Sequence, residues 1–446
     1  MKNHIDHIIV GAGISGLATG YFLKKQKKEF YIFESNKHIG GVINTEKINN
    51  FICENGPNTV MLNNNAIIEL IDDLLLTDKI IYPTKYVKNK FFLHEGKIVK
   101  FPNSIQSFIF TKLISYRTKL KTFMRLFFFK KGQYETVYKF FIKNFGVDFH
   151  DNIIEPFLNG IYAGNTKKMS LKHTLPKLWQ VNKNYNGILD YIISNYTKKN
   201  KKKNKKKNRK NPIYFKDGFI TLINKLKANL DEEIYTNFTV SEVTKFNKEK
   251  YLIKFSNGNK ITCNKIIFTI NPIKIFEIMN LKLDISNENL YNPIDVMHFA
   301  FSKKDYNNKI KGFGLLCKKS EGKSFLGILF NSDIFPNVAP VNQKLITVLI
   351  GGENQSNLCK LDKNKILNKV EDEIKELLGI KKIIFKKHFR WPNAIPRYNI
   401  ENIKFLNSNL NRKLLLNQNV FVNANYIQGV SVSDCILKSK KIAEKI

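Results

Sequence analysis

Three separated stretches of the chain share a pattern in which apolar strand positions lead into a turn and then into a helix or a further strand. The first stretch has the apolar run Ile8-Ile9-Val10, then glycines at positions 11, 13 and 16, and then apolar residues on one helical face from Ile14 to Phe22. A second apolar run follows at 30–33. This order predicts a parallel sheet with a crossover helix.

The other two stretches extend the same pattern. Residues 234–270 predict short strands with a turn at Asn257-Gly258 and a buried last strand that ends at Asn271-Pro272. Residues 419–446 predict a strand, a glycine turn and a final helix. We expect the three stretches to form one nucleotide-binding domain that insertions interrupt.

Residues 96–134, in the first insertion, contain nine Lys or Arg and no acidic residue. Apolar side chains are interleaved with the basic ones at helical spacing, at Phe108, Ile109, Leu113, Ile114, Leu120, Phe123, Met124 and Phe127–Phe129. This pattern is typical of a helix that lies on an anionic lipid surface, and it also fits an ordinary helix in a Lys-rich chain. Membrane-surface contact is therefore a hypothesis.

A second basic segment, Lys198–Lys210, contains ten Lys or Arg and three Asn. Because like charges repel, we expect a disordered surface loop between two domains. Binding to nucleic acid is the less favoured interpretation, since no aromatic or glycine-rich element that would stack on bases is interleaved with the charges.

The length of 446 residues allows two or three domains, and the formal net charge of +37 would attract polyanions. Only six of the 74 basic residues are arginine, while Asn, Ile, Phe and Tyr are abundant. Residues with A/T-rich codons have displaced others, so genome composition explains the charge better than a nucleic-acid partner does.

The five cysteines are far apart and form no C-x-x-C pair, and the eight histidines form no H-x-x-x-H pair. We therefore predict no disulfide framework and no metal, and a reduced cytoplasmic setting fits best. Neither a secretory signal nor a membrane-spanning helix is expected. Peripheral contact at the inner face of a membrane stays open as an alternative location.

The strongest chemical motif is Gly11-Ala12-Gly13-Ile14-Ser15-Gly16, directly after the first strand. Its glycines permit a tight turn and a close approach of the backbone to a pyrophosphate, and the helix N-terminus supplies N–H donors. Glu34 ends the second strand 21 positions after Gly13, where a carboxylate accepts hydrogen bonds from an adenosine ribose. The motif predicts a dinucleotide cofactor without a 2′-phosphate.

Two further segments favour FAD over NAD. Gly40-Gly41 and Glu54-Asn55-Gly56-Pro57 follow the ribose-binding acid, and together they resemble the flavin amine oxidase superfamily. Near the C-terminus, a strand runs into the turn 425–431 and the last helix. Backbone N–H groups at Gly429 and Val430 would there stabilise the negative charge that a flavin gains on reduction.

Other segments resemble one family within that superfamily, the protoporphyrinogen and coproporphyrinogen oxidases. The segment 155–165 reads E-P-F-L-N-G-I-Y-A-G-N, and 390–396 reads R-W-P-N-A-I-P. Gly312-Phe313-Gly314, Phe335-Pro336-Asn337 and the segment 425–435 are also similar to that family. The resemblance covers the chain except for the Lys-rich segment.

The resemblance implies an FAD site and a porphyrinogen site. Together with the motif, it assigns the cofactor to Gly11, Gly13, Ile14, Ser15, Gly16, Glu34, Ser35, Gly40, Gly41, Gly56, Pro57, Val240, Trp391, Asn425, Tyr426, Gly429, Val430 and Val432. It assigns the substrate to Lys97, Lys100, Gly160, Tyr162, Ala163, Gly164, Leu316 and Phe335. Lys97 and Lys100 stand near a position where many relatives have Arg, Arg397 stands where Gln is common, and Ala424 where glycine is usual.

The implied reaction is the oxidation of protoporphyrinogen IX, or of coproporphyrinogen III, on the route to haem. A methylene hydride passes to flavin N5 in three rounds, and O₂ is the expected acceptor, giving H₂O₂. No catalytic acid or base is assigned, because positioning against N5 suffices for a methylene that its own pyrroles activate. The product would pass to ferrochelatase.

The sequence thus predicts an α/β fold with a Rossmann-like FAD-binding domain built from discontinuous segments, an α+β substrate domain and a helical insertion. The FAD-binding domain is expected at 1–84, 212–275 and 388–446, and the substrate domain at 85–100, 151–195 and 276–387. The helical insertion is expected at 101–150 and the Lys-rich loop at 196–211. The alternatives are a carotenoid desaturase or amine oxidase on the same scaffold, or a nucleic-acid or lipid-binding protein with an inert fold.

Overall fold

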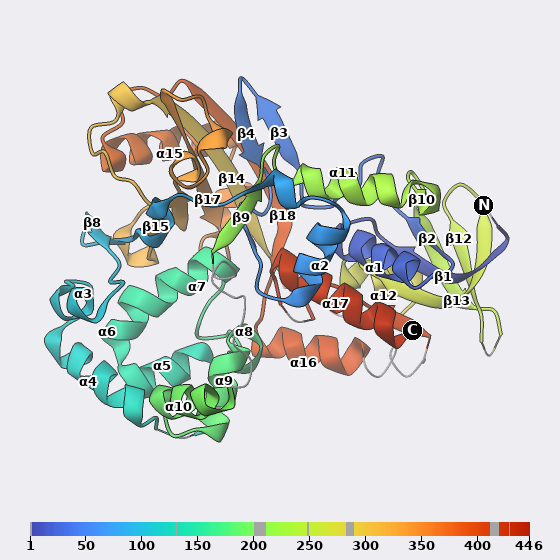
Figure 1. Cartoon of the computed structure of the whole chain (residues 1–446), viewed down its shortest axis with the longest axis horizontal. Helices are drawn as coiled ribbons and strands as arrows, with labels where there is room; N and C mark the ends of the chain where they lie inside the picture. The colour runs from blue at the N-terminus through green and yellow to red at the C-terminus, as the bar shows by residue number, and fades with distance from the viewer. Residues whose placement is uncertain are drawn as a thin grey trace. The chain divides into compact units, whose positions relative to one another are not determined.

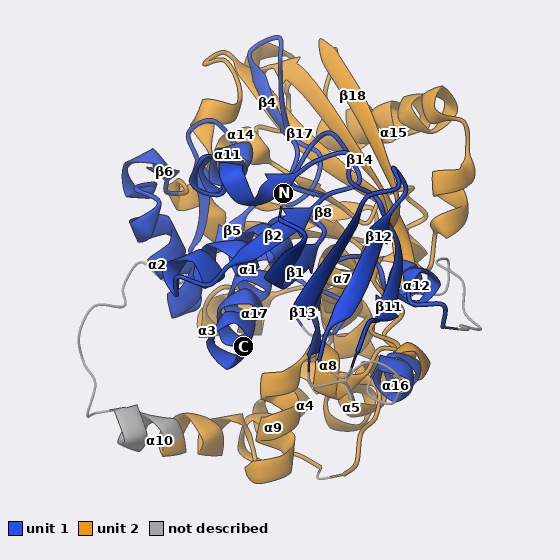
Figure 2. Ribbon diagram, turned by 90° about the vertical axis from the view of Figure 1, so that its right-hand side faces the viewer, with its two compact units in different colours: residues 1–82, 209–290, 403–446 blue, residues 83–208, 291–402 orange. Residues whose placement is uncertain are grey.

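The computed structural model describes residues 2–130, 132–199, 211–247, 249–281, 290–410, 419–427 and 429–446, with the backbone alone at 195–199. The chain divides into two compact units, shown in Figure 2. The first consists of residues 1–82, 209–290 and 403–446, and the second of residues 83–208 and 291–402. The predicted boundaries differ from this division at 276–290, which belongs to the first unit, and at 388–402, which belongs to the second. The predicted helical insertion at 101–150 is part of the second unit.

The first unit is built on a sheet with the strand order β10-β2-β1-β13-β12-β11, of which all strands but β11 are labelled in Figure 1. The strands of this unit, some of which form two smaller sheets, are β1 (His4–Val10), β2 (Phe30–Phe33), β3 (Thr45–Ile48), β4 (Phe51–Glu54), β5 (Val60–Met61), β6 (Ile80–Ile81), β9 (Pro212–Phe215), β10 (Ile234–Tyr235), β11 (Val240–Lys245), β12 (Tyr251–Phe255), β13 (Lys260–Phe268) and β19 (Val420–Val422). Its helices are α1 (Ile14–Lys25), α2 (Asn65–Asp73), α11 (Ile220–Asn229), α12 (Pro272–Ile278) and α17 (Val432–Lys445). α16 (Ile400–Asn409) spans the division at residue 403.

Strand β13 joins the three pieces of this unit. Along one edge it pairs in parallel with β1, up to Val10 beside Phe268. Along the other edge its first half pairs with β12 in antiparallel and its second half with β19 in parallel. The parallel strands β1, β13 and β19 therefore end together, at the edge of an α/β sheet where ligands bind.

The start of α12 differs from the sequence prediction. The buried strand ends at Phe268, not at Asn271-Pro272. Asn271 instead caps α12, since its side chain accepts a hydrogen bond from the N–H of Ile273 at 2.9 Å, and Pro272 is the first helical residue. Asparagine is a favoured helix cap and proline suits the first helical position, so the pair begins a helix here.

Buried polar contacts fix α1 against α17. Asn423, which follows β19, is completely buried, and its Nδ2 donates to Thr19 Oγ1 on α1 at 2.9 Å and to Ser439 Oγ on α17 at 2.8 Å. Ser439 Oγ also donates to the carbonyl oxygen of Ser15. The C-terminal piece is thereby tied to the helix that follows the first glycine turn.

The second unit contains a sheet with the strand order β18-β14-β17-β16-β15-β7-β8. Its strands are β7 (Lys90–His94), β8 (Lys97–Lys100), β14 (Tyr291–Ser302), β15 (Gly314–Cys317), β16 (Gly327–Leu329), β17 (Gln343–Gly351) and β18 (Phe385–Pro396). Its helices are α3 (Ile105–Phe110), α4 (Tyr116–Phe127), α5 (Val137–Phe145), α6 (Val147–Phe149), α7 (Glu155–Tyr162), α8 (Leu171–Thr174), α9 (Pro176–Asn184), α10 (Ile188–Lys199), α14 (Asn331–Ile334) and α15 (Lys363–Leu378). The buried faces of β14, β17 and α15 share one apolar core.

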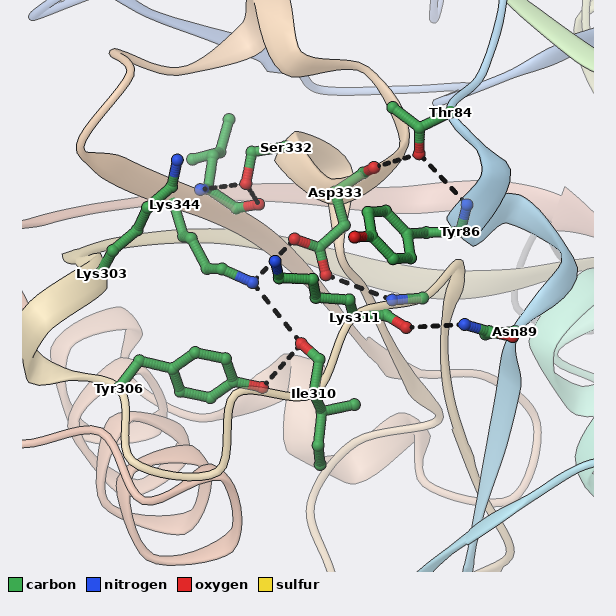
Figure 3. Close-up of polar contacts among 12 residues, drawn as sticks. Thr84, Tyr86, Asn89, Lys303, Tyr306, Ile310, Lys311, Ser332, Asp333 and Lys344 are labelled. Carbon is green, nitrogen blue, oxygen red and sulfur yellow. Dashed lines mark hydrogen bonds and ion pairs between the residues drawn. The ribbon is translucent and has the colours of Figure 1, made fainter.

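A buried ion pair holds the loops at one end of this sheet (Figure 3). Lys344 Nζ lies 2.7 Å from Asp333 Oδ1, and both side chains are almost fully buried. The other carboxylate oxygen accepts the N–H of Gly312 at 3.2 Å, and Thr84 Oγ1 donates to the carbonyl oxygen of Asp333 at 2.6 Å. These bonds hold Gly312, before β15, against α14, after which Phe335 follows.

The predicted Lys-rich loop at 196–211 lies outside the described residues, except for 196–199 at the end of α10 and residue 211. Among the residues that the structure describes, no helix has both the length and the hydropathy that crossing a bilayer requires.

Candidate functional site

The first glycine turn is shaped by contacts that a side chain would destroy. Gly11 has a φ of +104°, and a Cβ at Gly16 would lie 1.9 Å from the carbonyl oxygen of Gly11. The fold itself therefore requires glycine at both positions.

Gly13, by contrast, borders open space. It is the N-cap of α1 and gives the helix no side-chain cap. The atom nearest to a Cβ at Gly13 would be Gly41 Cα, at 3.9 Å. The second glycine turn lies beside the first, because Gly40 N–H donates to the carbonyl oxygen of Ala12 at 2.8 Å. A helix N-terminus without a side-chain cap and with room in front of it fits a pyrophosphate, and Ile14 and Ser15 begin that helix.

Glu34 lies beside this turn and is 9% exposed. Its Oε2 accepts the backbone N–H of Ala12 at 2.9 Å, while Oε1 accepts from the backbone and side chain of Asn36 and from Ser35 Oγ. Since a carboxylate oxygen accepts more than one hydrogen bond, Oε2 can still take a ribose hydroxyl. The residues present therefore fit the adenosine half of FAD.

The segment around Gly56 and Pro57 joins the same cluster. A Cβ at Gly56 would lie 2.0 Å from the carbonyl oxygen of Val42, directly after Gly41. Val240, at the start of β11, is buried, and the chain two residues earlier is held by a 2.9 Å hydrogen bond from Phe238 N–H to the carbonyl oxygen of Glu34. The structure thus brings these predicted residues together.

The C-terminal loop, residues 423–430, follows β19 at the same edge of the sheet. Asn425 is partly buried, and Tyr426 is buried and donates from its hydroxyl to the carbonyl oxygen of Ile270 at 3.1 Å. Gly429 has a φ of +74°, which favours glycine, and Val430 is partly exposed. Val432 begins α17, whose cap is Ser431. Residue 428 lies outside the described part of the chain.

Trp391 is the predicted cofactor residue that belongs to the second unit. It lies in β18, opposite Ile294 of β14, and packs against a small cluster that contains Ala163. Its place beside a flavin remains a prediction.

Among the predicted substrate residues, those of α7 and β15 lie together. A Cβ at Gly160 would lie 2.5 Å from Leu316 Cδ2. Tyr162 donates from its hydroxyl to the carbonyl oxygen of Thr174, and Ala163, at the end of α7, has a φ of +49°. Gly164 is buried against Met169.

The other predicted substrate residues are not brought together. Phe335 is 2% exposed and follows α14 as part of the packed interior. Lys97 and Lys100 are exposed at the two ends of β8, at an odd spacing that points their side chains to opposite faces of the sheet.

Two polar residues near the first unit's turns, Thr269 and Lys438, do not belong to any motif found in the sequence. Thr269 donates from Oγ1 to the carbonyl oxygens of Val10 and Gly11, both at 2.9 Å. Lys438 Nζ donates to the carbonyl oxygen of Ala424 at 2.5 Å, and burial lowers the pKa of its ammonium. The partners of Thr269 lie 259 and 258 residues away in the sequence. The partner of Lys438 lies only 14 residues earlier, but neither residue belongs to a recognised motif.

Glu54 was predicted only as part of a motif, and the structure gives it a defined environment. It is 3% exposed and accepts hydrogen bonds from Tyr214 Oη at 2.6 Å, from the N–H of Phe219 at 2.9 Å and from Thr45 Oγ1. Burial nevertheless raises the pKa of Glu54 from 4.5 to about 7, with the hydrogen bonds opposing this rise. The carboxyl group links β4, just before Gly56, to β9 and the start of α11.

Comparison with known proteins places this geometry in context. A family model described as flavin containing amine oxidoreductase matches residues 14–446. The chain is 26% identical to protoporphyrinogen oxidase 2, chloroplastic/mitochondrial, of Arabidopsis thaliana, over 87% of this chain and 84% of that protein. It is 24% identical to coproporphyrinogen III oxidase of Bacillus subtilis (strain 168), over 98% and 97% of the two chains.

Among solved structures, a protein of Exiguobacterium sp. 255-15, provisionally assigned as a protoporphyrinogen oxidase, has a TM-score of 0.82. The identity is 18%, over all of this chain and 98% of that one. At this identity the likeness concerns the fold alone, and it agrees with the predicted α/β architecture.

A substitution at Gly13 should separate ligand contact from folding. Gly13→Ala has room for its Cβ and an ordinary φ of −72°, so we expect the apoprotein to lose at most about 1 kcal/mol of stability. The Cβ would occupy space needed by the pyrophosphate, so the Kd for FAD should rise about tenfold or more. Fluorescence quenching of FAD and thermal unfolding of the apoprotein measure the two effects. Gly16→Ala, as the comparison, should lower both the affinity for FAD and the stability of the apoprotein. Unchanged FAD affinity in Gly13→Ala would place the phosphates elsewhere.

Glu54 should make stability depend on pH. Because its pKa is raised in the folded state, its stabilising contribution is complete below pH 4.5 and is lost as the pH rises through 7. Relative to Glu54→Gln, the wild type should therefore lose on the order of 3 kcal/mol between pH 4 and pH 8. Urea unfolding at several pH values measures this difference, and Glu232→Gln, at an exposed acid, serves as the control. A difference between wild type and Glu54→Gln that stays constant with pH would contradict the assignment.

Proposed function

Because this chain belongs to the flavin containing amine oxidoreductase family, and is an FAD-dependent oxidoreductase, we propose that it oxidises a porphyrinogen to a porphyrin on the route to haem. The observation that carries this proposal is the segment 155–165, which forms α7 and the turn after it. It lies against Leu316, in the second unit, and resembles the porphyrinogen oxidases. The named relatives support the same substrate class.

In this proposal the first unit binds and orients the cofactor. The turns at 11–16 and 40–41 hold the pyrophosphate, Glu34 holds the ribose, and the loop 423–430 holds the ring. FAD supplies the hydride acceptor for the porphyrinogen methylene. Backbone N–H groups at Gly429 and Val430 stabilise the negative charge that develops on the ring, because helix N-termini favour anions.

The second unit positions the substrate. The turn at Gly160–Gly164 and Leu316 provide contacts for the macrocycle, and the residue set contains no side chain that must act as acid or base. The pyrrole nitrogens activate the methylene, so a fixed orientation contributes most of what the protein adds to this step. Three rounds remove three hydrides from the methylene carbons and three protons, of which two come from pyrrole nitrogens and one from the fourth methylene. In each round O₂ accepts the two electrons and gives H₂O₂.

Turnover of purified protein tests this proposal. The protein should be yellow, bleach with porphyrinogen in the absence of air, and develop porphyrin fluorescence with one H₂O₂ per hydride when air is admitted. Protoporphyrinogen IX and coproporphyrinogen III, compared side by side, decide between the two substrates. A yellow protein that oxidises a primary amine or desaturates a carotenoid, and no porphyrinogen, would favour the alternative enzymes. A colourless protein that cannot take up FAD would exclude both the porphyrinogen oxidase and the alternative flavoenzymes.

We also propose that the helix α4 rests on an anionic membrane surface, with the rest of the protein in the cytoplasm and its product passed on to ferrochelatase. Tyr116, Leu120, Phe123 and Phe127 form one stripe of α4 and are between 43% and 74% exposed. Ile105 and Phe110 on α3 are 83% and 72% exposed. Exposed apolar side chains gathered in this way mark an interaction surface. The basic residues between them, Arg117, Lys119, Lys121 and Arg125, match a lipid surface of negative charge.

Liposome flotation tests the membrane proposal. Wild-type protein should float with vesicles that contain phosphatidylserine and much less with phosphatidylcholine alone. Replacing Leu120 and Phe123 by glutamate should lower the bound fraction about tenfold, since it removes apolar contact and adds repulsion. Leu75→Glu, at a leucine that is 77% exposed in the first unit, is the control and should float like the wild type. Equal flotation with both vesicle types would exclude an electrostatic attraction to the anionic lipid. Unchanged flotation of the double variant would exclude α4 as the membrane-contacting helix.

A further inference from the structure

Arg397 occupies a rigid position in the second unit. Pro396, immediately before it, is the last residue of β18 and pairs with β14. Tyr398, immediately after it, is 2% exposed, and its carbonyl oxygen accepts the N–H of Ser170 at 2.8 Å. The ring of Tyr398 lies edge-on to that of Tyr162, with 5.5 Å between centroids. The backbone of Arg397 is therefore fixed beside the C-terminal end of α7.

The side chain of Arg397 is fixed as well. Its Nε donates to Asn292 Oδ1 at 2.7 Å, and Asn292 is completely buried on β14. Asn292 is in turn oriented by its own Nδ2, which donates to the carbonyl oxygen of Tyr162 at 3.1 Å. This bond chain holds the plane of the guanidinium through Nε and leaves Nη1 and Nη2 available.

Arg397 differs from the two other arginines that the structure describes with hydrogen bonds, Arg390 and Arg125, in how its guanidinium is bound. Throughout the described part of the chain, no carboxylate lies within 4.0 Å of Arg397, and the bond to Asn292 is the one hydrogen bond its side chain makes. Arg390 differs, because its guanidinium is bound by both oxygens of Asp295 and by the carbonyl oxygen of Leu361. Arg125 is bound by two backbone carbonyl oxygens.

A guanidinium held at Nε presents two parallel N–H donors in a fixed plane, which match the two oxygens of a carboxylate. We propose that Arg397 binds one propionate of the substrate through Nη1 and Nη2 and so sets the orientation of the macrocycle beside α7. This assignment rests on the proposed function, since the carboxylate is that of a porphyrinogen. Lys97 and Lys100, on opposite faces of β8, offer only point charges at any one position.

The test compares Arg397 variants of the FAD-loaded enzyme on acid and esterified substrates. With coproporphyrinogen III, Arg397→Gln should raise KM about thirtyfold and change kcat less than about threefold. The variant loses the charge that pairs with the propionate, whereas the groups that take part in the chemical step are unchanged. Arg397→Lys should recover part of the loss, since it keeps the charge without the fork. With the tetramethyl ester, which carries no carboxylate, Arg397→Gln and wild type should have the same KM. Lys382→Gln, at an exposed lysine, is the charge control.

Three outcomes would overturn the proposal: an unchanged KM for the acid in Arg397→Gln, an equal rise for acid and ester, or full recovery by Arg397→Lys. Assays with and without inorganic phosphate distinguish a substrate carboxylate bound at Arg397 from a free phosphate ion bound there. If Arg397 only captured phosphate, omitting it would lower the wild-type KM for ester and acid alike, and that result would also contradict the proposal. Absence of porphyrinogen turnover by the wild type would reject the proposed function itself. Equilibrium binding of coproporphyrin III, followed by its absorbance, would then still compare wild type with Arg397→Gln.

Discussion

The contact between the start of α1 and the turn before it constrains the rest of the first unit. Because a Cβ at Gly16 would lie 1.9 Å from the carbonyl oxygen of Gly11, the first turn of α1 rests directly on the end of β1. This contact fixes where the N–H groups of α1 point, and the hydrogen bond from Ala12 N–H to Glu34 Oε2 fixes the carboxylate of Glu34 beside the same turn. Asn423 transmits the same constraint to the C-terminal loop, since it binds α1 and α17 together.

The parts of this arrangement that the sequence predicts are those encoded by local patterns. Glycine spacing, strand alternation and the acid at Glu34 are each legible within about 25 residues, and the α/β fold follows from them. Asn423, Thr269 and Lys438 could not be predicted, because each is a single polar residue whose partner is brought close only by folding. Local context also misassigned Asn271-Pro272, where capping chemistry outweighed the apolar run before it.

The substrate residues show the same limit in another form. A resemblance to known segments identified the end of α7, whose geometry depends on its own short sequence, including the left-handed backbone of Ala163. The same resemblance could not determine that Phe335 is enclosed by packing, or that Lys97 and Lys100 diverge. These properties depend on neighbouring strands and not on the motif. A scaffold shared by enzymes of several substrate classes therefore carries its specificity in side chains that motifs describe poorly.

Charge illustrates how a global property and a local one differ. The net charge of +37 is spread over many solvated lysines, and screening by salt reduces what any one of them contributes. Arg397 is one of only six arginines, yet a neutral buried amide orients it, and among the described residues no carboxylate lies within 4.0 Å of it. A fixed and unpaired guanidinium loses little entropy when a carboxylate binds, whereas a flexible lysine loses more. In the proposed role of Arg397, recognition of a carboxylate therefore depends less on the abundance of positive charge than on the hydrogen bond from Arg397 to Asn292.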